Sequence, residues 1–331
     1  MAKNKITSPL EFMEIVNNFR SSRIILTAYE LGLFTLLGSG KKLASEIALQ
    51  LNTDERATER LMNALSAMGI LSKKNKKFSN SEFSFKYLVK TSSSYMGGLA
   101  HVVNLWDTWD TLTEAVIAGT SIFNRGDINT RSKEWLGGFI AAMHSRTKMQ
   151  AKTILPLLDF KNVKVMIDIG GGSGGFVFEF IKKNKNLKAV VYDLPNVVTI
   201  TDKYISSEGF SETVKTVPGN YLHDELGEDY DMAFLSAVIH SNSQEENKHL
   251  FKKCYDSLNK GGQIVILDYV MDETRTEPAS GTIFAINMLV GTEKGDTYTE
   301  KEITGWLKEA GFRKIRRKNT KLDTALVIGI K

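Results

Sequence analysis

The sequence predicts an α/β protein in which a Rossmann-like, doubly wound sheet of seven strands, with an antiparallel last strand, follows a mainly helical winged-helix domain. Three observations predict this fold. The first hundred residues read as helices and a small hairpin, short apolar runs alternate with helical stretches after Pro156, and two strands follow one another at the end. A length of 331 residues, with 42% hydrophobic positions, is enough for two packed cores.

The N-terminal segment has the order of elements that a winged helix requires. Apolar residues at three- and four-residue spacing from Leu10 to Leu36 indicate one long or broken amphipathic helix. Two shorter helices are expected at Leu43 to Leu51 and at Thr53 to Met68, and Gly69 is placed to end the second. Ile70 to Ser79 reads as a hairpin, so helix, helix and hairpin predict the winged helix.

A winged helix can bind DNA, but the helix that would enter the groove argues against this use. It opens Thr53-Asp54-Glu55-Arg56, and carboxylates at that end would face phosphates. The net charge is +5, yet the lysines and arginines are spread along the chain. The long first helix offers more apolar face than one small domain can bury. We therefore expect no nucleic acid and a homodimer formed through this domain.

The remainder of the chain divides into helices and then a sheet. From about residue 97 to residue 158 further helices are expected, mostly core, although a few apolar side chains could line a pocket between domains. A helix from Thr299 to Ala310 begins with a capping box of Thr299 and Glu302. The expected strands are Val163–Ile169, Ala189–Tyr192, Val214–Val217, Met232–Leu235, Ile264–Tyr269, Phe312–Arg317 and Ala325–Ile330.

The first of these strands runs into a glycine loop, Asp168-Ile169-Gly170-Gly171-Gly172-Ser173-Gly174-Gly175. The glycines permit a tight turn and close approach of the backbone to a ligand. Gly170, Gly172 and Gly175 fit the dinucleotide pattern, which leaves a nicotinamide-dependent oxidoreductase as an alternative. Asp168, however, would repel a pyrophosphate and would suit a cofactor with a positive amino-acid head, such as S-adenosylmethionine.

Asp193 ends the second strand, in Tyr192-Asp193-Leu194-Pro195. At that position a carboxylate can accept hydrogen bonds from both hydroxyls of an adenosine ribose. The alternative interpretation is an aspartate that caps the helix starting at Pro195.

Together, these segments resemble the O-methyltransferases of the plant caffeate type and their bacterial antibiotic-pathway relatives. The resemblance spans nearly the whole chain. Besides the glycine loop and the Asp193 segment, it includes Ala28-Tyr29-Glu30-Leu31-Gly32-Leu33-Phe34 in the N-terminal domain, Ile239-His240 followed by Ser243-Gln244-Glu245-Glu246, and the terminal hairpin. The implied fold is the seven-stranded doubly wound methyltransferase sheet.

The resemblance implies a methyltransferase acting on a hydroxyl of a small, aromatic acceptor, with S-adenosyl-L-methionine as cofactor and S-adenosyl-L-homocysteine as product. His240 would be the general base and Asp268 the carboxylate beside it. The implied domains are a winged-helix dimerisation domain at 1–100, a helical connection contributing to the acceptor pocket at 101–158, and a cofactor-binding catalytic domain at 159–331. The expected cofactor contacts are Asp168, Gly170, Gly172, Gly174, Asp193, Leu194, Asn220, Tyr221 and Ser236. The expected pocket residues are Phe139, Met143, His144, Asn242, Phe284 and Met288, and helix packing is the favoured alternative for His144.

The chain departs from the plant members at several positions. Asn220 and Tyr221 replace an Asp and an apolar residue near the adenine, and Ser236 replaces a lysine that contacts the cofactor. Ser241-Asn242 stands where those members have Asp-Trp. Their second acid beside the histidine aligns with Thr297, next to Asp296. The acceptor pocket is therefore not the plant one.

The chemistry explains why a histidine is expected. Methyl transfer from a sulfonium is an in-line displacement, so the acceptor oxygen must be placed opposite the leaving sulfur and water kept out. A phenol has a pKa of about 10 and a histidine one of about 6.5, so His240 can take the proton as the oxygen attacks. His240 follows the fourth strand, at the sheet edge where such folds bind ligands. Carbon and nitrogen acceptors stay open as alternatives.

Several other classes of site are not expected. Histidines and acids have no metal-ligand spacing, and the single Cys254 cannot form an internal disulfide. No stretch approaches the roughly 18 apolar residues of a membrane span, and Met1 to Pro9 lacks the apolar core of a signal peptide. A cytoplasmic location without membrane association is expected.

Overall fold

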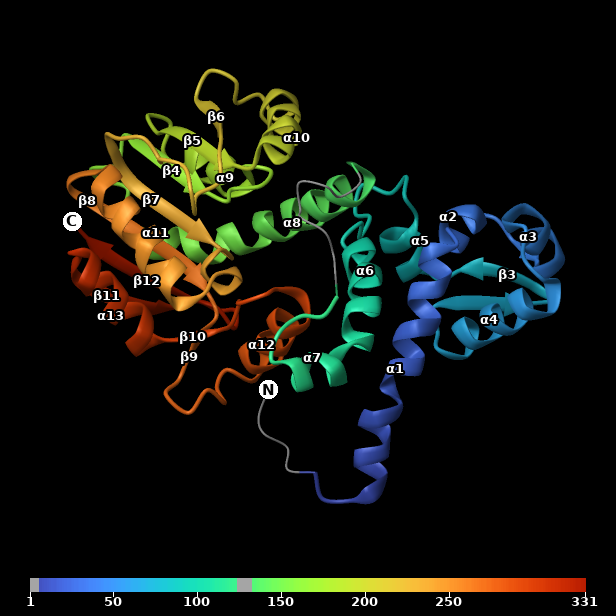
Figure 1. Ribbon diagram of the computed structural model, residues 1–331. Helices are drawn as coiled ribbons and strands as arrows, with labels where there is room; N and C mark the ends of the chain where they lie inside the picture. Colours follow the sequence, from blue (N-terminus) through green and yellow to red (C-terminus); the bar gives the residue numbers. More distant parts are fainter. Residues whose placement is uncertain (1–5, 124–132) are drawn as a thin grey trace. The chain divides into compact units, whose positions relative to one another are not determined.

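The computed structural model describes residues 6–123 and 133–331 (Figure 1). The chain forms two compact units, Met1–Trp106 and Asp107–Lys331. Within the described residues, no helix is both long and apolar enough to cross a bilayer.

The first unit contains the predicted winged helix. Its core is built around Phe34, Ile47, Met62 and Phe78. The predicted first helix is broken at Gly32, whose φ of +72° ends one helix and starts the next. The elements are α1 (Pro9–Glu30), α2 (Leu33–Leu37), β1 (Lys42–Leu43), α3 (Ala44–Leu51), α4 (Glu55–Ala67), β2 (Leu71–Lys74), β3 (Lys77–Asn80) and α5 (Glu82–Leu88), and α6 (Leu99–Asp110) follows them into the second unit. The three strands form an antiparallel sheet in the order β1-β3-β2.

The second unit is the predicted seven-stranded sheet, in the order β11-β12-β8-β7-β4-β5-β6 (Figure 1). Its strands are β4 (Val165–Ile169), β5 (Lys188–Asp193), β6 (Val214–Pro218), β7 (Tyr230–Ser236), β8 (Leu258–Asp268), β11 (Arg313–Asn319) and β12 (Ala325–Ile330). Strands β6, β5, β4, β7 and β8 run parallel to one another. The last strand, β12, is inserted between β8 and β11 and is antiparallel to both, as predicted.

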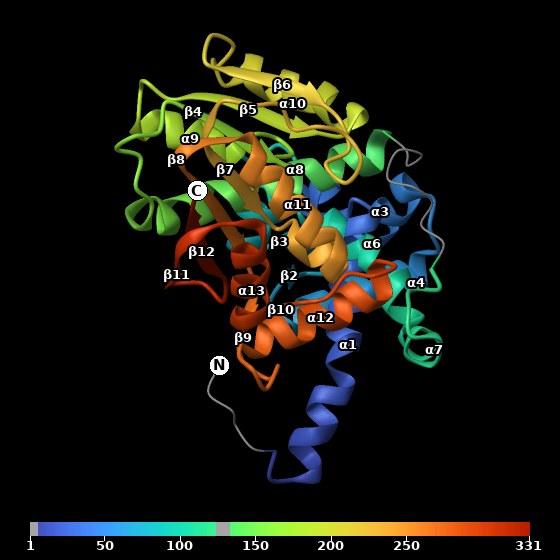
Figure 2. The same cartoon turned by 60° about the vertical axis from the view of Figure 1, so that its left-hand side comes forward.

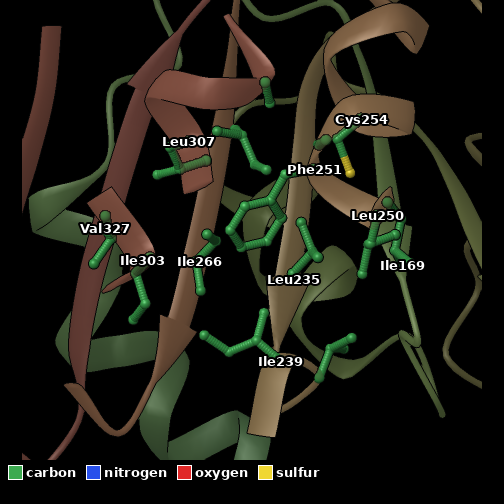
Figure 3. Packing of buried hydrophobic residues seen from close by; sticks show 14 of the residues in the cluster. Ile169, Leu235, Ile239, Leu250, Phe251, Cys254, Ile266, Ile303, Leu307 and Val327 are labelled. Carbon is green, nitrogen blue, oxygen red and sulfur yellow. The ribbon is translucent and has the colours of Figure 1, made fainter. Parts of the chain in front are cut away.

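Helices cover both faces of this sheet (Figures 1 and 2). Side chains alternate between two buried clusters because successive strand residues point to opposite faces. Leu235 and Ile266 pack with α11 (Gln244–Ser257) and α13 (Glu300–Ala310), whereas Phe234 and Val265 pack with α8 (Lys133–Ile154) and α9 (Gly175–Lys183). Figure 3 shows the first cluster. The helical elements are α7 (Leu112–Ala118), α8 (Lys133–Ile154), η2 (Leu155–Leu157), α9 (Gly175–Lys183), α10 (Pro195–Ser207), η3 (Ile239–Ser241), α11 (Gln244–Ser257), α12 (Ala279–Gly291) and α13 (Glu300–Ala310).

One small feature was not predicted. β9 (Val270–Met271) and β10 (Tyr298–Thr299) form a two-stranded parallel sheet beyond the end of β8. This pairing brings the segment before α13 to the sheet edge where β7 and β8 end.

Candidate active site

The carboxyl ends of four neighbouring parallel strands bring the predicted polar residues to one edge of the sheet. Asp168 lies in β4, Asp193 ends β5, Ser236 ends β7 and Asp268 ends β8. After β4 the chain adds β5 and β6 on one side of that strand, and it then crosses to add β7 and β8 on the other side. The strand order therefore reverses at the carboxyl end of β4. Open α/β sheets bind ligands at such a point.

The glycine loop after β4 has the backbone that a close-approaching ligand needs. Gly170, Gly172 and Gly174 have φ values of +67°, +56° and +75°. These conformations favour glycine, because a side chain would be strained there. At Gly170 a Cβ would also lie 2.9 Å from a methyl of Val238.

Asp193 is fixed against this loop. One carboxylate oxygen accepts the Gly172 N–H at 2.8 Å, and the other accepts the Leu194 N–H at 2.8 Å. Burial raises the pKa of Asp193, and these two hydrogen bonds oppose that rise. The start of α10 has no side-chain cap, so Asp193 is not the helix-capping residue of the alternative interpretation. Each oxygen retains a lone pair for a ligand hydroxyl.

Asp168 is the one acid of this edge without a donor. It is 1% exposed, and within 6–123 and 133–331 neither of its carboxylate oxygens has a hydrogen-bond partner. Burial raises the pKa of Asp168 well above its usual range, and the charge of Asp193 adds to the rise. A carboxylate that lacks a donor fits a neighbouring ammonium group, and it does not fit a pyrophosphate. The acid and the glycine loop thus fit S-adenosylmethionine.

His240 and Asp268 form a hydrogen-bonded pair. The imidazole Nδ1 lies 2.8 and 3.0 Å from the two oxygens of Asp268, and the Tyr269 N–H donates to the nearer oxygen at 2.8 Å. Both side chains are buried. With Nδ1 bound to a carboxylate, Nε2 is the nitrogen that can take a proton.

The turn that carries His240 is anchored by its neighbours. Ile239 is packed in the hydrophobic cluster of α11 and α13 (Figure 3). Ala237, between β7 and η3, has a φ of +58°, a conformation that a non-glycine residue adopts only when its surroundings impose it. The His240 ring meets the edge of Phe284 at 4.8 Å between centroids, and Phe284 in turn packs on Tyr269.

The predicted pocket residues separate into two groups. Phe284 contacts His240, and Met288 is buried one helical turn further along α12. On α8, Phe139 stacks on Trp135 and Met143 is half-buried. His144, also on α8, contacts Ser173 of the glycine loop.

Asn242 and Tyr221 belong to a buried polar network. The Tyr221 hydroxyl donates to the Asn242 side chain at 3.0 Å, and the Asn242 amide donates to Asn247 at 3.1 Å. The Tyr298 hydroxyl donates to the Asn242 carbonyl. The Asn220 side chain accepts the N–H of Leu222 and so supports its own turn. The network connects the segment after β6 to the turn that carries His240.

The segment aligned with the second acid of plant members lies directly under His240. The Asp296 N–H donates to the His240 carbonyl at 3.0 Å, and Gly295 approaches the same carbonyl so closely that a Cβ would collide with it. The Asp296 carboxylate faces Arg275 at 3.4 Å, and Thr297 is buried. Among the described residues, Asp268 is therefore the one carboxylate that is hydrogen-bonded to the His240 ring.

Two supporting residues were not predicted from the sequence. The Thr201 hydroxyl on α10 donates to the Gly172 carbonyl at 2.5 Å, and Arg275 donates to the Thr297 carbonyl at 2.8 Å. Neither position carries a local pattern that reveals it, because each contact joins segments far apart in the sequence. In the described part of the chain, no three His, Cys, Asp or Glu side chains are grouped as metal ligands would be.

Comparison with known families decides the assignment. Residues 109–313 match the model of the O-methyltransferase domain, and residues 13–90 match that of the O-methyltransferase dimerisation domain. The chain belongs to the O-methyltransferase family. This membership confirms the predicted enzyme class, an S-adenosylmethionine-dependent O-methyltransferase acting on small molecules, and it removes the oxidoreductase alternative.

The O-methyltransferase has similar relatives over its whole length. It is 27% identical to a 3-hydroxy-5-methyl-1-naphthoate 3-O-methyltransferase of Streptomyces sahachiroi, over 93% of this chain and 90% of the relative. It is 28% identical to the acetylserotonin O-methyltransferase of Gallus gallus, over 95% and 96%. The structure of human N-acetylserotonin methyltransferase in complex with SAM has the same fold, with a TM-score of 0.85 at 24% identity over 100% and 99% of the two chains.

Proposed function

We propose that this O-methyltransferase methylates a hydroxyl of a small aromatic acceptor, with His240 as the general base. The observation that carries the proposal is the His240–Asp268 pair, 2.8 Å apart, at the ligand-binding edge of the sheet. Asp268 would hold the Nδ1–H tautomer and stabilise the imidazolium that forms.

The reaction can be followed bond by bond. When bound, S-adenosylmethionine supplies an electrophilic methyl group. The acceptor oxygen forms a bond to the methyl carbon while the carbon–sulfur bond breaks, and the hydroxyl proton moves to Nε2 of His240. A neutral thioether and a methyl ether are the products, and the proton on His240 is later released to solvent. Placing the oxygen in line with the leaving sulfur supplies much of the rate.

The remaining residues of the site would bind the cofactor and the acceptor. We assign the ribose hydroxyls to Asp193, the ammonium group to Asp168 and the backbone contacts to Gly170, Gly172 and Gly174; Leu194, Asn220, Tyr221 and Ser236 complete the predicted cofactor site. An aromatic acceptor is supported by the rings of Phe284 and Tyr269 beside His240 and by the naphthoate named for a relative. Phe139, Met143 and Met288 would line the rest of the pocket.

We also infer that residues 1–100 form a homodimer interface. Apolar side chains on α1 are largely exposed, among them Leu10, Phe12 and Phe19. Exposed apolar surface of this extent marks an interaction site, and the matched dimerisation domain favours a second copy of the chain. Sedimentation equilibrium tests this: a species of twice the 37.0 kDa chain mass is expected, and a Leu10→Glu and Phe19→Glu double variant should shift it toward the monomer.

Two measurements test the proposed reaction. S-adenosylhomocysteine should raise the melting temperature, whereas NAD and NADP should not, because only a ligand that binds the native state stabilises it. A panel of hydroxylated aromatic compounds is then incubated with S-adenosylmethionine carrying a ¹³C-methyl group. A gain of one methyl, placed on oxygen by NMR, is expected. A methyl on carbon or nitrogen would overturn the proposal.

A further inference from the structure

His144 is a buried titratable side chain that the proposed reaction does not use. It lies on α8 and is 8% exposed. Its Nδ1 is 2.9 Å from the Ser173 hydroxyl of the glycine loop, and its ring stacks on Tyr204 of α10 at 4.4 Å between centroids. Its Nε2 is 3.6 Å from Glu208. Both ring nitrogens therefore face polar groups.

The glycine loop is held by side chains from three separate elements. Asp193 of β5 binds the Gly172 N–H, Thr201 of α10 binds the Gly172 carbonyl, and His144 of α8 binds Ser173. The backbone of the loop adds a hydrogen bond from the Gly170 N–H to the Tyr192 carbonyl at 2.8 Å. A loop rich in glycine has much conformational freedom to lose, so such external bonds determine which conformation it keeps.

The contact between α8 and the loop leaves no spare room. A Cβ on Gly175, the first residue of α9, would collide with Thr147 and would lie 3.3 Å from Nδ1 of His144. Ser173 is only 2% exposed, so its hydroxyl would lose a partner if the histidine were removed.

We propose that His144 is a positioning residue: through its bond to Ser173 it holds the glycine loop in the conformation that binds the cofactor. The inference rests on the proposed cofactor site at that loop. It differs from the acceptor-pocket position that was expected for His144 from the sequence.

The charge state of the ring agrees with this role. Burial lowers the pKa of His144, nearby Lys148 lowers it further, and Glu208 opposes the change. The ring is therefore neutral at neutral pH, with one acceptor nitrogen and one N–H. Ser173 can donate its hydroxyl proton to Nδ1, which leaves the N–H on Nε2 directed toward Glu208.

The test measures the affinity for S-adenosylhomocysteine by calorimetry in a set of variants of the full chain. His144→Leu removes the polar atom, whereas His144→Asn retains an amide near the place of Nδ1. Losing one buried hydrogen bond costs about tenfold in affinity, so His144→Leu and Ser173→Ala should each weaken binding by that factor. The double variant should be no weaker than either single one, and His144→Asn should recover most of the affinity.

Controls separate positioning from general loss of structure. Ser257→Ala is a matched control, because Ser257 is a buried serine on α11 whose hydroxyl bonds to the Cys254 carbonyl at 3.0 Å. It should leave the affinity unchanged. Steady-state kinetics should show a raised KM for S-adenosylmethionine and an unchanged kcat at saturation. If His144→Leu does not fold, as judged by circular dichroism, Ser173→Ala and His144→Asn carry the test.

The outcomes are distinct for the two proposals. A wild-type chain that does not bind S-adenosylhomocysteine would overturn the proposed cofactor site itself. A wild-type chain that binds it, with Ser173→Ala within twofold or with additive effects in the double variant, would overturn the role of His144 alone.

Discussion

His240 and His144 lie in the same unit, and both are buried with a polar group at Nδ1, but their partners differ in kind. The partner of His240 is the carboxylate of Asp268 at 2.8 Å. The partner of His144 is the neutral hydroxyl of Ser173, and its nearest carboxylate, Glu208, is 3.6 Å away. A carboxylate at hydrogen-bond distance stabilises a protonated ring, whereas a hydroxyl does not. The nature of the partner, more than burial, therefore distinguishes the proposed base from the proposed positioning residue.

The largest effect is expected from His240→Ala. We expect turnover of a hydroxyl acceptor to fall by about two to four powers of ten, since general-base catalysis contributes that much. The affinity for S-adenosylhomocysteine should stay within twofold, because His240 makes no contact with the glycine loop among those described. Single-turnover rates and calorimetry on one preparation check both. The exposed His249→Ala is the control, and unchanged turnover in His240→Ala would mean that the proton goes elsewhere.

Asp268→Asn should have the next largest effect, a loss of about a hundredfold in kcat. The amide has the shape of the carboxylate but cannot stabilise an imidazolium, and it can turn its N–H toward Nδ1 and reverse the tautomer. The measurement is kcat at saturating concentrations of both substrates. A loss of less than fivefold would show that Asp268 serves the fold and not the base.

The difference between the two histidines also shows what sequence reasoning can reach. His240 follows β7 and Asp268 ends β8, and the carboxyl ends of parallel strands meet at one edge, so the predicted sheet agrees with the pair that the resemblance implied. The predicted sheet brings the glycine loop and Asp193 to this edge for the same reason. The alternation of short apolar runs with helices, together with the family resemblance, was sufficient to predict the seven-stranded sheet and its antiparallel last strand.

The contact of His144 with Ser173 could not be predicted, because helix periodicity predicts a buried face and not the neighbour that covers it. Its partner is 29 residues away on a loop, and nothing in the spacing of α8 reveals that contact. Asn242, expected in the acceptor pocket, has an amide group that is hydrogen-bonded to Tyr221 and Asn247, and its position in the sequence does not reveal these contacts. Buried polar groups form hydrogen bonds with segments that are distant in the sequence, and a single sequence does not specify which residues will be the partners.

Glu208→Gln tests the carboxylate near His144, which lies farther from its ring than Asp268 lies from the ring of His240. We expect the affinity for S-adenosylhomocysteine to change by less than about threefold, because a half-exposed ion pair contributes little. Glu208 is 27% exposed and is bound by Lys148 at 2.8 Å, which lowers its pKa. Calorimetry measures the affinity of Glu208→Gln for S-adenosylhomocysteine, and the value is compared with that of His144→Leu. A tenfold loss in Glu208→Gln would mean that Glu208 is a true partner of the ring and that the two histidines are more alike than we propose.

The smallest effect is expected from Asp296→Asn, which tests whether His240 has a second acid. The Asp296 side chain is 48% exposed and its carboxylate faces Arg275, while the bond that reaches His240 comes from the backbone N–H, which the substitution retains. An exposed ion pair is worth about 0–1 kcal/mol, so kcat should stay within twofold. The assay is the one used for Asp268→Asn, so the two acids are compared directly. A loss approaching that of Asp268→Asn would place two carboxylates on the base and would make its environment similar to that of the plant enzymes.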